Sequence, residues 1–245
     1  MTGEFIVIPD VHGRKFWRDV VKGNESKRII FLGDYLDPYS FEGVSYEDAF
    51  NEFNDILAFK KAHPDNVTLL LGNHDMGYLE QNICRVRQDS QRREQYKKIL
   101  QDNLALFDIV ALEELGDQSI LLSHAGVRRK WINGNSWLFD LNDFRPEVLN
   151  EFFHDRSRRD HLYAALADVS GYRGGWKLAG SVIWADIHEF IYDDDELPGY
   201  FQIFGHTLHK GGAWRIDESL WCLDCAKGFK VGWSEDRAKV EIVEL

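Results

Sequence analysis

Five short clusters of polar residues combine carboxylate, amide and imidazole side chains, and each of them follows an apolar run. In chain order the clusters are Asp10-Val11-His12, Gly33-Asp34, Gly72-Asn73-His74-Asp75, Ser123-His124-Ala125-Gly126 and Gly205-His206-Thr207. Carboxylate and amide oxygens and imidazole nitrogens are the side-chain ligands of divalent transition metals in proteins. The clusters therefore indicate a metal centre assembled from five separate parts of the chain.

These ligands are sufficient for two divalent cations held side by side. A carboxylate that bridges the two cations is the usual core of such a site, and we assign the bridge to Asp34. Asp10 and His12, at the end of one apolar run, would hold the first cation. The expected ligands of the second cation are Asn73, His124 and His206. This mixture suits Mn, Fe or Zn better than Ca, and we expect Mn.

Two cations at such a centre would direct the chemistry to phosphorus. They lower the pKa of bound water and attract phosphoryl oxygens, so a metal-bridging hydroxide can attack phosphorus directly. The leaving group then needs a proton, and His74, next to Asn73 but not required as a ligand, is placed to donate it. Asp37 or Asp75 would orient the His74 imidazole. The pattern predicts hydrolysis of a phosphate ester.

The elements that must position these side chains are short strands. The apolar runs before the clusters span residues 5–8, 29–32, 67–71, 120–122 and 201–204. They are brief and rich in β-branched residues, which is typical of buried strands rather than helices. Open α/β sheets build their sites at the carboxyl ends of strands, and that is where the clusters lie.

Helical periodicity appears between these strands. It predicts a short helix over 13–22 and amphipathic helices over 46–57 and 88–107. Residues 128–180 break the rhythm of strands, and we interpret them as a mainly helical insertion in a single domain that spans 1–245. Further strands are expected at 181–184, 201–205, 213–217, 220–224 and 240–243, in a second, largely antiparallel sheet, with a loop over 193–196.

Composition excludes several functional classes. The 245 residues carry 29 Lys and Arg against 41 Asp and Glu, a net charge of −12, which disfavours stable binding to nucleic acid or to anionic membranes. No apolar run approaches a membrane span and no leader is evident, so we expect a cytoplasmic protein. Three cysteines predict reduced thiols, with Cys84 structural and Cys222 and Cys225 in a strand-like run.

In this order, the five motifs resemble the signatures of the calcineurin-like metallophosphoesterase superfamily. Residues 10–13, 33–37, 72–75, 123–126 and 205–207 look like DxHG, GDxxD, GNH(E/D), (S)HAG and GHT. Residues 183–186 and 223–226 look like features of its branch of phosphoprotein phosphatases and diadenosine tetraphosphatases. The resemblance implies a mixed α/β fold, a two-sheet sandwich flanked by helices. It also implies the ligand set above, with His74 as general acid supported by Asp37.

The chain departs from that branch at the residues that contact phosphate. The branch usually has an arginine after the second aspartate of GDxxD and another before GNH, where this chain has Pro38 and Leu71. Arg128, which follows the His124 motif, and Arg173, in a glycine-rich stretch, are the candidate substitutes. A solvated turn is an equal interpretation for residues 128–130, and most of the basic run over 85–98 is interpreted as the solvated face of a helix.

We predict a hydrolase that acts on phosphomonoesters, including phosphoserine or phosphothreonine in a protein. A dinucleoside polyphosphate or nucleotide hydrolase is the alternative, because the phosphatase arginines are missing and the insertion is aromatic. Trp131, Trp137 and Trp176 are candidates to stack on a base, although core packing is expected for at least two of them. A third hypothesis is a non-catalytic scaffold. The expected partner is a phosphorylated small molecule, nucleotide or phosphoprotein.

Overall fold

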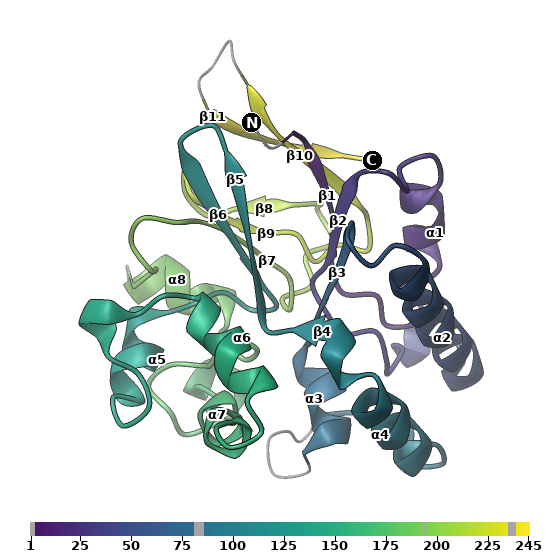
Figure 1. Ribbon diagram of the computed structural model, residues 1–245, viewed down its shortest axis with the longest axis horizontal. Helices are drawn as coiled ribbons and strands as arrows, with labels where there is room; N and C mark the ends of the chain where they lie inside the picture. The colour runs from purple at the N-terminus through teal and green to yellow at the C-terminus, as the bar shows by residue number, and fades with distance from the viewer. Residues whose placement is uncertain (1–2, 81–85, 194, 235–238) are drawn as a thin grey trace.

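The computed structural model describes residues 3–80, 86–193, 195–234 and 239–245, and these residues form two sheets flanked by helices (Figure 1). The strands are β1 (Phe5–Ile8), β2 (Arg28–Phe31), β3 (Val67–Leu70), β4 (Phe107–Asp108), β5 (Val110–Leu115), β6 (Gln118–Ser123), β7 (Phe201–Phe204), β8 (Trp214–Arg215), β9 (Leu220–Cys222), β10 (Phe229–Ser234) and β11 (Lys239–Glu244). The expected mixed α/β fold with two sheets and flanking helices is confirmed.

Helices fill most of the connections. The α-helices are α1 (Phe16–Val21), α2 (Tyr46–Ala62), α3 (Asn73–Leu79), α4 (Arg93–Asp102), α5 (Arg129–Gly134), α6 (Glu147–His154), α7 (Arg159–Leu166) and α8 (Ile187–Asp193). Short 3-10 turns are η1 (Ser40–Glu42), η2 (Leu104–Leu106), η3 (Leu141–Asp143) and η4 (Gly171–Arg173). Figure 1 shows α1, α2 and α4 on one side of the pair of sheets and α5 to α8 on the other.

The first sheet has the order β11-β10-β1-β2-β3-β4, and the second has the order β5-β6-β7-β9-β8. Strands β1 to β4 are parallel, as are β6, β7 and β9. The carboxyl ends of the parallel strands in each sheet therefore lie along one edge of that sheet. The loops that leave these ends carry the polar clusters.

The side chains of β1 alternate between two apolar cores, one between the two sheets and one between the first sheet and its helices. Phe5 and Val7 belong to the core that also contains Ile120 and Ile203 of the second sheet, so they fill the space between the sheets. Side chains of successive strand residues point to opposite faces, and Ile6 and Ile8 accordingly join the larger core with the α2 residues. Both faces of the central strands β1, β2 and β3 are thus covered, which is why these three strands are almost entirely apolar.

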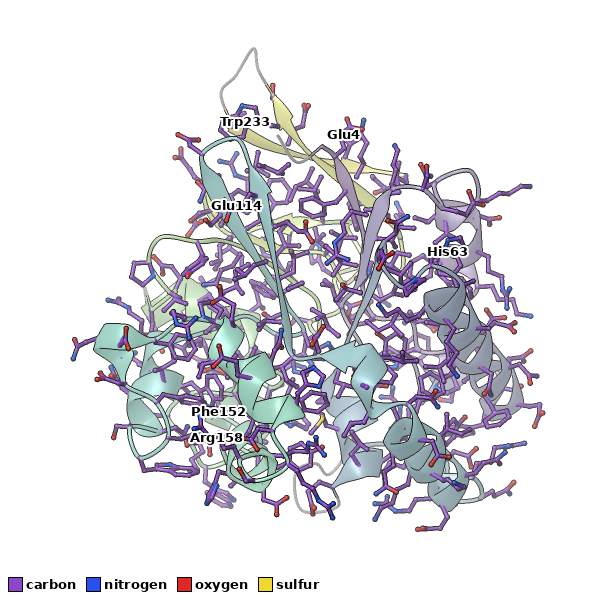
Figure 2. The ribbon with its side chains drawn as sticks, viewed as in Figure 1. Glu4, His63, Glu114, Phe152, Arg158 and Trp233 are labelled. Carbon is purple, nitrogen blue, oxygen red and sulfur yellow. The ribbon has the colours of Figure 1, made fainter. Side chains whose placement is uncertain are left out.

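The segment 128–180 contains α5, α6, α7, η3 and η4 and, among its described residues, no strand. Its helices pack through aromatic side chains. Trp131 is buried and donates from its indole nitrogen to the Ala165 carbonyl oxygen at 3.1 Å. Phe152 of α6 lies beside Arg158, whose guanidinium carbon is 5.0 Å from the ring centroid (Figure 2).

Several predicted boundaries were wrong. Residues 88–107 form a shorter helix, α4, and the following turn η2, because Gln88 to Arg92 are drawn into a loop around the buried Asp89. Residues 181–184 form a turn rather than a strand, since their backbone bonds locally, with the Trp184 amide donating to the Ser181 carbonyl at 2.8 Å. Burial, not strand pairing, makes this run apolar. Strand β10 and helix α8 were not anticipated.

The expected second sheet is mixed rather than largely antiparallel, because β6, β7 and β9 pair in parallel and residues 239–244 join the first sheet instead. Cys84 and Arg85 lie outside the described residues. Cys222 is buried and Cys225 half-buried, and both are free thiols. No helix in the described part of the chain is both long and apolar enough to cross a membrane.

Gly33, between β2 and the Asp34 loop, offers a test of this architecture. Its φ is +106°, and a Cβ there would lie 2.4 Å from the Gly72 backbone nitrogen. We expect Gly33→Ala to lower the free energy of unfolding by about 3 kcal/mol, because it adds backbone strain and a clash between two loops. Urea denaturation measures this loss.

Gly23→Ala is the matched control. Its φ is +80° and nothing lies within 4 Å of the added Cβ, so only the conformational cost applies, about 1 kcal/mol. Equal losses for the two variants would contradict the proposed close approach of the Gly33 and Gly72 loops.

Candidate metal centre

The predicted site residues lie in loops at strand ends. Asp10 and His12 follow β1, Asp34 and Asp37 follow β2, Asn73 and His74 open α3 after β3, His124 follows β6, and His206 follows β7. Four of them have a positive φ, namely His12 (46°), Asp34 (51°), Asp37 (61°) and His206 (68°). Such backbone costs about 1–3 kcal/mol per residue outside glycine. It turns these side chains off the pleat of their strands and toward one another.

Asp34 stands in the middle of the cluster. One of its carboxylate oxygens, Oδ2, is 3.5 Å from His12 Nε2, and the other, Oδ1, is 3.6 Å from His124 Nε2. Its side chain is almost fully buried. A carboxylate whose two oxygens face two different imidazoles has the geometry that a bridging ligand needs.

Three donors converge on the far side of Asp34. His124 Nε2 lies 3.0 Å from Asn73 Oδ1 and 3.1 Å from His206 Nδ1. All three side chains are buried. Atoms that bind one cation must lie around one point, and these atoms do so with the Asp34 oxygen beside them.

Backbone carbonyls fix the orientation of two of the imidazoles. His12 Nδ1 is 2.8 Å from the Leu36 carbonyl oxygen, and His124 Nδ1 is 2.9 Å from that of Leu32. A ring N–H donated to a carbonyl leaves the other nitrogen, Nε2, with its lone pair free for a metal. In both rings that nitrogen faces Asp34.

Asp10 lies on the first side of the cluster but is not one of its tightest members. Its carboxylate oxygens accept from the His206 amide at 3.0 and 3.2 Å. The group of ligand atoms within 4.8 Å of one another on this side comprises His12, Asp34 and His74. His74 therefore lies closer to the first candidate position than the sequence suggested.

The residues present fit divalent cations. Burial raises the pKa of Asp34 well above its usual value, and the charge of nearby Asp10 adds to this rise. Burial likewise lowers the pKa of His12 and His206 well below the ordinary value, so both are neutral and able to act as ligands. A Cβ at Gly72 or Gly205 would lie 2.1 Å from a carboxylate oxygen, of Asp34 or Asp10 respectively. The two glycines thus leave room for these carboxylates.

His74 is held by Asp37. Its Nδ1 is 2.8 Å from Asp37 Oδ2, while Asp37 Oδ1 accepts from the Tyr78 hydroxyl at 2.5 Å. Burial lowers the pKa of His74 to about 3, helped by the charge of Arg87, and burial raises the pKa of Asp37 to about 7. The His74 ring therefore has a fixed orientation, with Nε2 turned away from Asp37.

Asp75, the other candidate to orient His74, has a different task. Its carboxylate accepts from the amides of Asp34 (2.8 Å), Tyr35 (3.1 Å) and Gly72 (2.9 Å). These bonds join the loop after β2 to the loop after β3. Asp37 alone of the two aspartates contacts the His74 ring among the described hydrogen bonds.

The expectation that Arg128 contacts the substrate is not supported by its position. Its side chain has no exposed surface, and it pairs with Glu189, Asp193 and Asp195. A guanidinium enclosed by three carboxylates has no face left for a phosphate. Arg128 instead fixes α8 and the following residues against the start of α5.

Arg173, by contrast, reaches the centre. Its Nη2 donates to the Thr207 hydroxyl at 2.6 Å and lies 3.4 Å from the His206 carbonyl oxygen. Its Nε is 2.7 Å from Asp186 Oδ2, and a quarter of its side chain is exposed. The helical segment 128–180 thus places the guanidinium group of Arg173 beside the candidate metal ligand His206.

Sequence reasoning missed Arg87. This exposed residue donates from Nη2 to the Asp37 carbonyl oxygen at 2.9 Å, and its guanidinium carbon is 4.0 Å from the Tyr39 ring centroid. Its positive charge also lowers the pKa of His74. Its place in a basic run suggested a solvated helix face, but α4 begins only at Arg93, so Arg87 lies in the loop before that helix.

The fold and the motifs at its strand ends agree with a match to one protein family. The chain belongs to the calcineurin-like phosphoesterase family, whose model matches residues 4–210, and the resemblance drawn from the motifs is thereby confirmed. Membership supports the assignment as a hydrolase that binds metal.

Solved structures share the fold at low sequence identity. One is the cold-active protein-tyrosine phosphatase of a psychrophile, Shewanella sp., with a TM-score of 0.61 and 13% identity over 95% of this chain and 76% of that chain. Another is a protein serine/threonine phosphatase from Saccharomyces cerevisiae with similarity to human phosphatase PP5. It has a TM-score of 0.55 and 14% identity, and covers 100% of this chain and 80% of its own.

The buried acids predict how pH and cations affect stability. Histidines with a lowered pKa are neutral in the folded chain, while in the unfolded chain they are about half protonated at pH 6.5 and neutral only above about pH 7.5. Acids with a raised pKa, including Asp37 at about 7 and Asp34, hold protons near neutral pH only in the folded chain. The metal-free protein should therefore lose stability as the pH rises from 7.5 to 9.

Divalent cations replace those protons, so they should stabilise the protein more at pH 8 than at pH 6.5. At a hundredfold excess over Kd we expect Mn²⁺ to add about 2.7 kcal/mol, a rise in Tm of about 5–10 °C. Thermal melts of EDTA-treated protein with and without Mn²⁺ measure this. An equal Mn²⁺ shift in Asp34→Asn would contradict the site.

Proposed function

We propose that this protein hydrolyses phosphate monoesters at a centre for two divalent cations. The observation that carries the proposal is the position of Asp34, whose two oxygens face two separate groups of imidazoles. Asp10, His12 and Asp34 would hold the first cation. The second would take Asp34 together with Asn73, His124 and His206. Mn is the cation we expect, with Fe and Zn as alternatives, because the donor set mixes oxygen and imidazole nitrogen.

When bound, the two cations supply Lewis-acid chemistry, since they offset phosphate charge and lower the pKa of water. The protein supplies the remaining groups. His74 would give a proton from Nε2 to the leaving oxygen, and Asp37, whose pKa is raised to about 7, would hold the proton that His74 takes up at Nδ1 in exchange. Asp37 positions that ring, and Tyr78 in turn fixes Asp37.

Arg87 and Arg173 would hold the phosphate oxygens. Arg87 lies beside the His74–Asp37 pair, and Arg173 lies beside His206. Guanidinium groups bind phosphate through paired N–H donors. They would replace the arginines that the chain lacks at Pro38 and Leu71.

The substrate could be a phosphorylated small molecule, a nucleotide or a phosphoprotein. A dinucleoside polyphosphate or nucleotide hydrolase is the second candidate, favoured by the two absent arginines and by exposed aromatic side chains close to Arg173. A scaffold without activity is disfavoured by the complete His74–Asp37 pair. Residence in the cytoplasm stays a prediction from the sequence.

Activity and metal content together distinguish the role of Asp34 as a metal ligand from the role of His74 as the general acid. We expect Mn²⁺-loaded wild type to hydrolyse p-nitrophenyl phosphate, and Asp34→Asn to lose both activity and bound metal. His74→Asn should keep its metal but lower kcat about 10²- to 10⁴-fold, because only proton transfer is lost. Metal analysis of each purified variant accompanies the assay.

The matched control is His63→Asn, the same substitution at the C-cap residue that follows α2 (Figure 2). It should leave kcat within twofold of wild type. An inactive wild type with two bound cations, or full activity in Asp34→Asn, would refute the proposal.

The two arginines should act on substrate binding. We expect Arg87→Ala and Arg173→Ala each to lower kcat/KM about ten- to hundredfold, the cost of a charge-assisted hydrogen bond to phosphate, with metal content unchanged. Steady-state kinetics with p-nitrophenyl phosphate measure this. Arg145→Ala, which removes only a surface ion pair with Glu151, is the control. A normal kcat/KM in both site variants would mean that phosphate is held by other groups.

A further inference from the structure

A row of aromatic side chains lies next to Arg173. We call Tyr172, His188 and Tyr192 the aromatic row. The His188 ring is nearly parallel to Tyr172, at 14° and 6.0 Å between centroids, and to Tyr192, at 17° and 6.1 Å. Tyr172 and Tyr192 are 56% and 69% exposed. Tyr172 belongs to η4, while His188 and Tyr192 lie one turn apart on α8.

The row is joined to the candidate metal centre through one carboxylate. Asp186 Oδ1 is 2.7 Å from His188 Nδ1, and Asp186 Oδ2 is 2.7 Å from Arg173 Nε. Arg173 in turn donates to Thr207, the neighbour of the candidate ligand His206. A molecule whose phosphate lies at the centre would therefore have to extend past Arg173 and Asp186 to contact the aromatic row.

The aromatic row is held in place but leaves ring surface exposed. Asp186 also accepts from the His188 amide, and the Trp214 ring meets His188 edge-on at 6.5 Å. No hydrogen bond to the Tyr172 or Tyr192 hydroxyl is found within the described part of the chain. Flat, ordered and exposed rings are what a stacking platform requires.

We propose that the aromatic row binds the base of a nucleoside phosphate whose phosphate group lies at the metal centre. This inference rests on the proposed phosphoesterase function and names its substrate class. Every nucleobase has a π-face that stacks on Tyr or His, and Arg173 supplies a positive charge between base and phosphate. The net charge of −12 favours a free nucleotide over a nucleic acid strand.

The side chains that stand between the row and the centre argue against phosphotyrosine. In phosphotyrosine the ring is bonded directly to the phosphate oxygen, so it would lie over the cations. In a nucleotide the ribose separates base from phosphate. Because Arg173 and Asp186 lie between Thr207 and His188, the arrangement matches a ligand with such a spacer.

The test compares adenosine 5′-monophosphate with ribose 5-phosphate, which has the same phosphoester without a base. For the Mn²⁺-loaded wild type, we expect kcat/KM to be at least fivefold higher for the nucleotide. Tyr172→Ala should reduce the ratio of the two kcat/KM values at least threefold, and Tyr172→Phe should preserve it because the ring remains. The control is Trp137→Ala, which removes an exposed aromatic ring elsewhere in the segment 128–180.

The outcomes separate this inference from the proposed function. Hydrolysis of both compounds with equal kcat/KM overturns the base site and leaves the phosphoesterase intact. A preference for O-phosphotyrosine that disappears in Tyr172→Ala also overturns it. If p-nitrophenyl phosphate and both sugar phosphates all remain unhydrolysed, the proposed function fails. In that case, calorimetry on the Mn²⁺-loaded protein compares the binding of the two sugar phosphates. Tighter binding of the nucleotide than of ribose 5-phosphate, lost in Tyr172→Ala, supports the base site. Equal binding of the two compounds overturns it.

Discussion

The carboxylate of Asp75 ties together the two loops on which the candidate centre depends. It has no exposed surface and accepts from the amides of Asp34, Tyr35 and Gly72. Buried carboxylates are stable only when their oxygens are satisfied, and here the donors come from the ends of β2 and β3. The same three bonds set the backbone of Asp34 and the start of α3. Asp34 and His74 are therefore positioned by a residue that needs no contact with substrate.

Cation binding would be coupled to the stability of the fold through the buried acids around the Asp75 carboxylate. Asp34 and Asp224 each have a pKa raised by burial and by the charge of Asp10. Ionising several carboxylates in one buried region costs free energy unless positive charge accompanies them. Two described cationic side chains near Asp224 already have acidic partners, since Arg14 pairs with Glu42 and Arg173 pairs with Asp186. Divalent cations would supply the positive charge that compensates these buried carboxylates when they are ionised.

The sequence allowed the candidate metal site to be predicted in more detail than the surroundings of the phosphate. Ligands such as His124 and His206 each follow their own strand, so short-range patterns locate them. Arg128 and Arg87 were misjudged because their environments come from distant segments, Glu189 for one and Asp37 for the other. Local patterns also mistook the buried run 181–184 for a strand, since burial alone makes a run apolar.

The residues proposed for the reaction and those proposed for substrate choice lie in different parts of this chain. The candidate ligands follow strand ends, and two of them, His12 and His124, are held in orientation by the Leu36 and Leu32 carbonyls. Arg87, Arg173 and Tyr172 come from a loop and from the helical segment. Loops tolerate change better than the sheet does. A chain of this family that lacks arginines at Pro38 and Leu71 could therefore keep the proposed metal centre, provided that other segments bring positive charge to the phosphate.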